Sequence, residues 1–244
     1  MSVAQVVMDE DATLTRACFG WSVRAWAAPW RRFVRAQGNW HCGSALEIGA
    51  GARSSLAPLL LPLAEQVECS SFDAAALPLI QARHARLLPS NEAQRIRYTQ
   101  QDARKLHGRW DLIVMKSVLG GIHRVHDSTL ADVRATLSDI VNNHLEPGGL
   151  LVTLDNGRTA LEPLLAHLGA RRNGWRFFTR DDFPPVDACY GFGAVSAFSA
   201  ATRLGWLGQR IDDALYGIDC LLAPLADQAH SPCAVYLHVY RKPA

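Results

Sequence analysis

Apolar runs alternate with helix-like segments through the middle of this chain, and this alternation limits the possible folds more than any other feature. Five runs have the character of buried strands: 44–48, 66–72, 96–101, 110–116 and 150–154. The segments between them with helical character are 54–65, 74–88 and 128–145. Strands that alternate with helices predict a mostly parallel sheet with helices on both faces. We therefore expect an α/β three-layer sandwich.

The first 43 residues precede this alternation and are expected to be mostly helical. They hold four of the chain's seven tryptophans, namely Trp21, Trp26, Trp30 and Trp40. The favoured interpretation is an amphipathic helix that uses tryptophan to fill the core. A helical cap or lid over a ligand site is the alternative. A membrane-surface helix ranks third, because the polar face is not consistently basic.

The part of the chain after Asp155 is less regular. It predicts a helix over 158–168, a strand over 175–179, a helical stretch near 195–223 and a closing strand over 234–240. Residues 181–232 are too many for a simple connection, and segments of this kind are often functional. We expect them to form a helical insertion before the last strand. It would supply an acceptor-pocket wall, a packing helix or a surface for a second copy.

Composition and charge exclude several classes of protein. Lys and Arg total 25 against 23 for Asp and Glu, so the chain lacks the basic excess of a nucleic-acid-binding protein. No apolar run reaches the ~18 residues that a membrane span needs. The first residues are acidic where a signal peptide is basic, and the six cysteines form no CxxC pair. We expect a cytoplasmic protein with reduced thiols.

Glycines and acids stand where the first three strands end. Gly49 and Gly51 follow the first strand, where glycine permits a sharp turn and close approach of a ligand to the backbone. A dinucleotide loop (GxGxxG) would have a third glycine at position 54, which is Ser54. Glu47 would repel a pyrophosphate but attract a ligand that carries an ammonium and a sulfonium. These residues favour a cationic nucleoside over a dinucleotide.

Two further acids extend this pattern to the next strands. Asp73 lies about 20 residues beyond the glycine loop, the distance at which an acid reaches both hydroxyls of a ribose. Its other role would be to cap the helix that begins near Ala74. Asp102 follows the third strand and could accept the exocyclic amine of an adenine, or it is an acid of a surface turn. Acids at three successive strand ends favour a binding role.

The chain resembles the class I S-adenosylmethionine-dependent methyltransferases over residues 44–155. Five pieces follow one another with the family's order and spacing: LEIGAG (46–51), SFDAAALPLIQAR (71–83), YTQQDARKL (98–106), WDLIVMKSVLGGI (110–122) and LEPGGLLVTLD (145–155). One departure is Arg53, which stands where many members have a third glycine. The resemblance implies a Rossmann-like methyltransferase domain over 44–244, with its cofactor half at 44–155 and the substrate side at about 181–232, behind the helical cap of residues 1–43.

The resemblance also assigns cofactor-binding residues. It implies that Glu47, Gly49, Ala50 and Gly51 line the methionine part of S-adenosylmethionine, and that Asp73 holds the ribose. Asp102 and Ala103 would contact the adenine, and Lys116, Ser117 and Val118 would lie beneath the transferring methyl. No metal site is identifiable.

A candidate base follows the fourth strand. In a helix, His123 and Asp127 would share a face, and the carboxylate would orient the imidazole and raise its basicity. A hydroxyl acceptor needs such a base, whereas a carboxylate or an unprotonated amine does not. The alternative is that His123 and the nearby His126 are polar residues of a loop.

We therefore expect a methyl transfer from S-adenosylmethionine to a hydroxyl of a small molecule or saccharide. Nucleic acid is not the expected acceptor, because Lys116-Ser117-Val118-Leu119 stands where base methyltransferases have an NPPY-type segment. One alternative is a regulatory protein on the same fold that binds the cofactor without transferring the methyl. Another is an NAD-dependent oxidoreductase, against which Ser54 and Glu47 argue.

Overall fold

The computed structural model describes residues 12–20, 22–159, 174–195, 205–226 and 231–244. Its sheet consists of strands β1 (Cys42–Ile48), β2 (Ala64–Ser71), β3 (Ile96–Gln100), β4 (Trp110–Lys116), β5 (Leu145–Asn156), β6 (Ala188–Phe192) and β7 (Val235–Arg241). The α-helices are α2 (Ala12–Phe19), α3 (Val23–Gln37), α4 (Ala57–Leu60), α5 (Leu77–Leu87), α6 (Ser90–Ala93), α7 (Leu119–Ile122), α8 (Leu130–Asp139) and α11 (Gly205–Leu222). Short 3-10 turns cover Ala74–Ala76 and Arg180–Asp182, and a π turn covers Ile140–His144.

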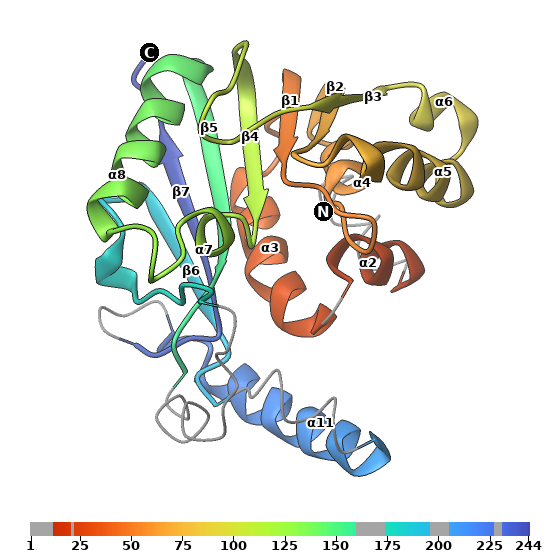
Figure 1. Ribbon diagram of the computed structural model, residues 1–244. Coiled ribbons are helices and arrows are strands. Elements are labelled where there is room, and N and C mark those ends of the chain that lie inside the picture. Colours follow the sequence, from red (N-terminus) through yellow and green to blue (C-terminus); the bar gives the residue numbers. More distant parts are fainter. Residues whose placement is uncertain (1–11, 21, 160–173, 196–204, 227–230) are drawn as a thin grey trace.

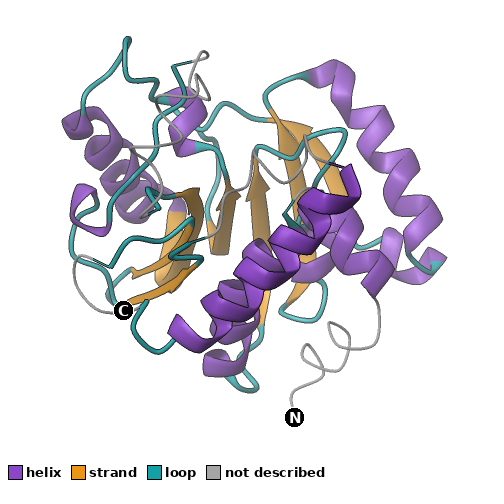
Figure 2. Ribbon diagram, turned by 90° about the horizontal axis from the view of Figure 1, so that it is seen from below, coloured by secondary structure: helices purple, strands orange, loops and turns teal. Residues whose placement is uncertain are grey.

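The strands lie in the order β3-β2-β1-β4-β5-β7-β6 (Figure 1). Neighbouring strands from β3 through β5 are parallel, whereas β7 runs antiparallel to both β5 and β6. The chain moves outward from β1 through β2 to β3 and then returns to the other side of β1 with β4. A ligand site is expected at such a switch point, beyond the carboxyl ends of the strands. Helices lie on both faces of the sheet (Figure 2), which confirms the expected three-layer, mostly parallel architecture.

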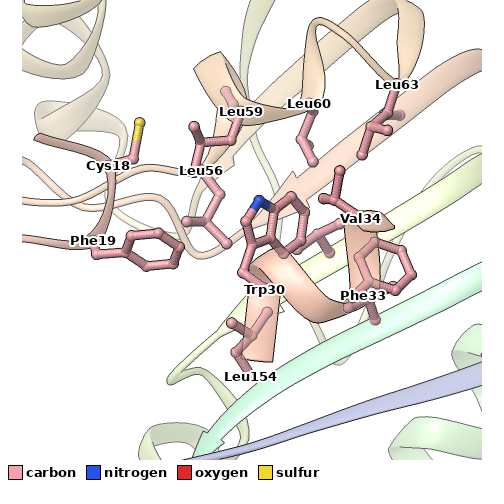
Figure 3. Packing of buried hydrophobic residues seen from close by; sticks show 14 of the residues in the cluster. Cys18, Phe19, Trp30, Phe33, Val34, Leu56, Leu59, Leu60, Leu63 and Leu154 are labelled. Atoms are coloured by element: carbon pink, nitrogen blue, oxygen red, sulfur yellow. The ribbon is translucent and has the colours of Figure 1, made fainter. Parts of the chain in front are cut away.

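One face of the sheet is covered by the N-terminal helices together with α4 and α5. The side chains of Trp26, Trp30 and Phe33 on α3 are fully buried. Figure 3 shows the Trp30 ring among residues from four parts of the chain: Phe19, Val34, Leu56, Leu59, Leu60 and Leu154. Trp26 and Trp30 therefore fill the core, which is the favoured interpretation of this segment; Trp21 lies outside the described residues.

The other face packs against α7, α8 and the segment around Phe178. Its core holds Ile113 and Met115 from β4, Leu151 from β5, and Val133 and Leu137 from α8. Thr129 begins α8 as a capping box with Asp132, which explains why the helix starts there. α8 ends at Asp139 and the π turn at His144, two residues before Glu146-Pro147-Gly148-Gly149.

Several predicted elements differ from the structure. The helix expected over 54–65 is limited to α4, because β2 already begins at Ala64 and Pro62 precludes helical continuation. β5 begins five residues early, since Leu145 pairs with Trp110 before the register shifts. No strand covers 175–179, where Phe178 forms only one bridge to Gly157. β6 was not expected. Of the helix expected over 158–168, residues 160–173 lie outside the described part of the chain.

α11 is the helix of the insertion expected before the last strand. It projects beyond the edge at which β1 and β4 end (Figure 1). Residues 196–204, at the start of the helical stretch expected near 195–223, lie outside the described part. No described helix has both the length and the apolar character needed to cross a membrane.

Candidate active site

The glycine loop follows β1 at the carboxyl edge of the sheet. Gly49 has a φ of +80°, a conformation that favours glycine. Gly51 and Ser54 exchange two backbone hydrogen bonds of 2.8 and 3.1 Å, which fold the loop into a tight turn. Ala50 is buried and donates its backbone N–H to the Ser70 carbonyl. The loop is thus a closed turn fixed to β2, and its first glycine is exposed.

The glycine loop also lies close to the segment after β4. A Cβ added to Gly49 would lie 2.5 Å from Val118 Cγ2, closer than carbon atoms approach one another. Glycine is therefore required here for two reasons, its backbone conformation and the neighbouring valine. The structure therefore places Gly49 next to Val118. That both residues line one ligand stays a prediction.

Glu47 lies beneath the loop. Its side chain is 3% exposed and accepts hydrogen bonds from the backbone N–H of Leu56 at 2.6 Å, from that of Ala57 at 2.8 Å, and from the Ser55 hydroxyl. Burial raises the pKa of Glu47, and these hydrogen bonds oppose that shift. The carboxylate therefore holds the loop and the start of α4. This geometry differs from the expected direct attraction of a cationic ligand.

Asp73 lies just beyond β2 and is exposed. Its Oδ1 accepts the Ala75 backbone N–H at 2.9 Å, so it caps the 3-10 turn that precedes α5. Its Oδ2 makes no hydrogen bond to a described residue. The two roles expected for Asp73 are compatible, because one oxygen caps the turn and the other is available to a ligand.

Asp102 follows β3 and is held by Arg104. The guanidinium donates to both carboxylate oxygens at 3.0 to 3.1 Å, and the Arg104 backbone N–H donates as well. These contacts lower the pKa of Asp102, so it is ionised at neutral pH. Ala103 is buried next to it. A ligand amine at Asp102 would share this carboxylate with Arg104.

The end of β4 has an unusual backbone conformation. Ser117 has a φ of +56°, which is rare for a residue other than glycine. Its backbone N–H donates to Leu154 at 2.7 Å, and its hydroxyl accepts from the Asn156 side chain at 2.7 Å. Residues held in such conformations cluster at functional sites. β5 thus fixes the turn that brings Val118 to Gly49.

Lys116, the last residue of β4, has a buried side chain. Its Nζ lies 4.8 Å from the centre of the Trp26 ring, within cation–π distance. Burial lowers the pKa of Lys116 to about 7. No local pattern connects Trp26 with Lys116, since α3 and β4 are far apart along the chain.

His123 and Asp127 do not form the expected pair. Because α7 ends at Ile122, the two residues share no helical face. The His123 ring is buried, and its Nε2 lies 2.9 Å from the Thr136 hydroxyl of α8. Burial lowers the pKa of His123, so the ring is neutral at pH 7. Asp127 is exposed in the loop that follows α7. The prediction that Asp127 orients the His123 ring is therefore wrong, because the helix that would align the two residues does not form.

β5 and β7 share a buried polar group that no sequence motif predicted. Asp155 is 1% exposed, and burial raises its pKa to about 7. His238 is fully buried opposite Thr153, and neither of its ring nitrogens has a partner among the described residues. Alternation in the two strands could have revealed the group, because Thr153, Asp155 and His238 interrupt an apolar face.

The described residues contain no group of three or more metal-binding side chains.

The N-terminal segment contacts the glycine loop at Gly20, which follows α2. A Cβ on Gly20 would lie 2.8 Å from the Arg53 carbonyl oxygen. The N-terminal segment thus touches this edge both at Gly20 and through Trp26. Whether residues 1–43 act as a cap or lid stays a prediction.

No protein-family model matches the chain, and no curated protein sequence matches it. Several solved structures, in contrast, resemble the chain in fold. Magnesium protoporphyrin IX methyltransferase from Synechocystis PCC 6803, solved with S-adenosylhomocysteine, is 18% identical with a TM-score of 0.50, over 66% of this chain and 69% of its own. Phosphoethanolamine N-methyltransferase 2 from Haemonchus contortus is 16% identical with a TM-score of 0.54, over 90% of this chain and 53% of its own.

The YcgJ protein from Bacillus subtilis is 12% identical with a TM-score of 0.54, over 89% of this chain and 99% of its own. At these identities the comparisons establish the fold. The chain has the class I methyltransferase fold, as the resemblance of residues 44–155 implied.

Proposed function

We propose that this chain is an enzyme that binds S-adenosylmethionine and transfers its methyl group to an acceptor. One observation carries the proposal: Gly49 and Asp73 stand exposed at the ends of adjacent strands in a sheet of this fold. Magnesium protoporphyrin IX methyltransferase, which shares this fold, was solved with S-adenosylhomocysteine bound. Phosphoethanolamine N-methyltransferase 2 was solved with the same compound.

The residues present fit this cofactor. Gly49 is exposed where β1 ends, so a ligand can reach the loop backbone there, and the missing Cβ lets Val118 pack beside it. The available oxygen of Asp73 would accept a ribose hydroxyl, and the ionised Asp102 would accept the adenine amine. Glu47 would not contact the cofactor itself. It would hold the loop in shape by accepting the backbone N–H groups of Leu56 and Ala57.

The cofactor supplies a methyl group that is already activated by its sulfonium. The chain's own residues then have to hold the acceptor in line with the methyl–sulfur bond, near ~3 Å, which needs no covalent enzyme intermediate. The rigid turn at Ser117, bonded to Leu154 and Asn156, would keep this end of the site in place.

The acceptor that we propose is a hydroxyl of a small molecule or saccharide. Loss of the hydroxyl proton calls for a base, and His123 is the candidate. Its ring is neutral at pH 7, Thr136 orients it through Nε2, and its Nδ1 makes no hydrogen bond to a described residue. α11 projects beyond this edge of the sheet and would form a wall of the acceptor site (Figure 1).

Binding and turnover test the proposal separately. Thermal unfolding with S-adenosylmethionine, S-adenosylhomocysteine or NAD should show stabilisation by the first two and none by NAD, since only ligands of the native state raise its stability. Methyl-labelled cofactor with small hydroxylated acceptors should then yield labelled product. Stabilisation by NAD alone would support the oxidoreductase. Binding without label transfer to any hydroxyl, amine or carboxylate acceptor would support the regulatory alternative.

A further inference from the structure

Lys116 occupies a special position in the sheet. The last residues paired between β1 and β4 are Ile48 and Met115, so Lys116 lies one position further, beside Gly49. Its side chain is 7% exposed and reaches over the Trp26 ring. A buried amine thus stands where the glycine loop leaves β1, at the switch point of the sheet.

Burial and a neighbouring carboxylate act on the pKa of Lys116 in opposite directions. Burial lowers its pKa to about 7, while the charge of Glu47 on β1 acts in the opposite direction. Among the described residues packed against it, α3 presents the uncharged Trp26 and β5 pairs it with the apolar Leu154. Asp155 follows Leu154 and points to the other face of the sheet. One additional charge nearby would therefore decide whether the amine is protonated.

The strand order indicates where the ligand's charge would fall. The ribose would lie at Asp73 beyond β2, and the adenine at Asp102 beyond β3. The rest of the ligand would then extend the other way, across β1 toward β4, and adjacent strands are only about 4.8 Å apart. This direction brings the sulfur end to Gly49 and Lys116. S-adenosylmethionine carries a positive sulfonium there, whereas S-adenosylhomocysteine carries a neutral thioether.

We propose that Lys116 distinguishes S-adenosylmethionine from S-adenosylhomocysteine by charge, an inference that rests on the proposed function. Beside the sulfonium, two cations would repel each other in a buried site, so Lys116 gives up its proton to solvent. Beside the thioether it keeps a proton. A protonated site therefore releases one proton for each S-adenosylmethionine that it binds. As the pH falls, the product competes more strongly with the cofactor.

Titration calorimetry of both ligands between pH 6 and pH 8 tests the inference. The ratio of the S-adenosylhomocysteine Kd to the S-adenosylmethionine Kd should rise about tenfold over this range, because each pH unit below the pKa weakens cofactor binding about tenfold. At pH 7, titrations in two buffers of different ionisation enthalpy should show release of about half a proton per cofactor. The ligand's own amino group also titrates in this range, so variants must isolate the contribution of Lys116.

Two variants do so. Lys116→Met, which has no charge, should bind both ligands with a ratio that changes less with pH than in the wild type. Lys116→Arg, which stays charged, should bind S-adenosylhomocysteine but bind S-adenosylmethionine weakly at every pH. The exposed Arg86 on α5 provides the control for a lost positive charge, and Arg86→Met should behave as the wild type.

The possible failures can be told apart. One outcome is that the wild type binds both ligands while Lys116→Met and Lys116→Arg show the same ratio of Kd values, with the same pH dependence, as the wild type. In that case the inference is overturned and the proposed function stands. If the wild type binds neither ligand, the proposed function fails and the inference fails with it. If Lys116→Met does not fold, the proton release of the wild type and the affinities of Lys116→Arg still decide.

Discussion

The Glu47 carboxylate accepts the Leu56 backbone N–H at 2.6 Å, so a side chain of β1 fixes the chain where α4 begins. The same carboxylate also accepts from Ala57 and from the Ser55 hydroxyl. Three donors on one buried acid explain how it is tolerated beneath the loop, since a buried charge is costly without hydrogen bonds.

Glu47→Gln should destabilise the protein. An amide has one accepting oxygen instead of two, and its NH₂ would face donors that now bind the carboxylate. We expect a loss of about 1–3 kcal/mol in the free energy of unfolding, the usual cost of leaving buried donors unpaired. Urea unfolding measures it. Glu65→Gln, on an exposed part of β2, should change little, and equal losses in the two variants would contradict this role.

Gly49→Ala should disturb the loop through a clash as well as through backbone strain. The added Cβ would lie 2.5 Å from Val118 Cγ2, at a residue whose φ is +80°. Gly38 is a matched control, because its φ is +63° and an added Cβ would meet nothing within 4 Å. Gly38→Ala should cost about 1–3 kcal/mol of stability from strain alone. Gly49→Ala should cost about 1–3 kcal/mol more, as overpacking does.

A second substitution checks the origin of that difference. Val118→Ala removes the clashing methyl groups, so it should restore part of the stability lost in Gly49→Ala while adding none to Gly38→Ala. Denaturant unfolding of the four variants forms a double-mutant cycle. Purely additive effects of Gly49→Ala and Val118→Ala would show that the two residues do not meet.

Asp73→Asn should separate capping from ligand binding. Asparagine is also a good cap, so the hydrogen bond from the Ala75 backbone N–H should remain and the free energy of unfolding should not change. The available oxygen of Asp73 loses its charge, and we expect cofactor binding to weaken by about 1–3 kcal/mol. Calorimetry with S-adenosylhomocysteine measures this, with Glu65→Gln as a control for lost charge. Unchanged affinity would remove Asp73 from the ribose site.

The predictable parts of the fold are those whose signal is local. The first four parallel strands appear as apolar runs because both of their faces are buried, and their observed bounds lie within two residues of those expected. β6 was missed because its five residues ACYGF include a glycine and make sense only against β7, which follows more than 40 residues later. The early start of β5 depends in the same way on a single pairing with Trp110.

The candidate site also has parts that local sequence patterns predict and parts that they do not. Glycines and acids at strand ends can be located from the sequence, because the ends of parallel strands meet at one edge. The partner of each side chain depends on packing between distant segments. His123 meets Thr136 rather than Asp127, and Lys116 meets Trp26, because α8 and α3 cover opposite faces of β4. No local pattern encodes these contacts.

His238 should make the protein sensitive to acid. Burial lowers its pKa to about 3, so in the folded protein it stays neutral down to that pH, whereas in the unfolded chain it protonates near 6.5. The unfolded state therefore binds more protons between pH 6.5 and 3, and stability falls as the pH is lowered through this window. From pH 7 to pH 5 the wild type should lose about 2 kcal/mol more than His238→Leu. Urea unfolding at both pH values measures it. His107→Leu, at an exposed position, is the control, and parallel pH curves for wild type and His238→Leu would show that His238 is not the group responsible.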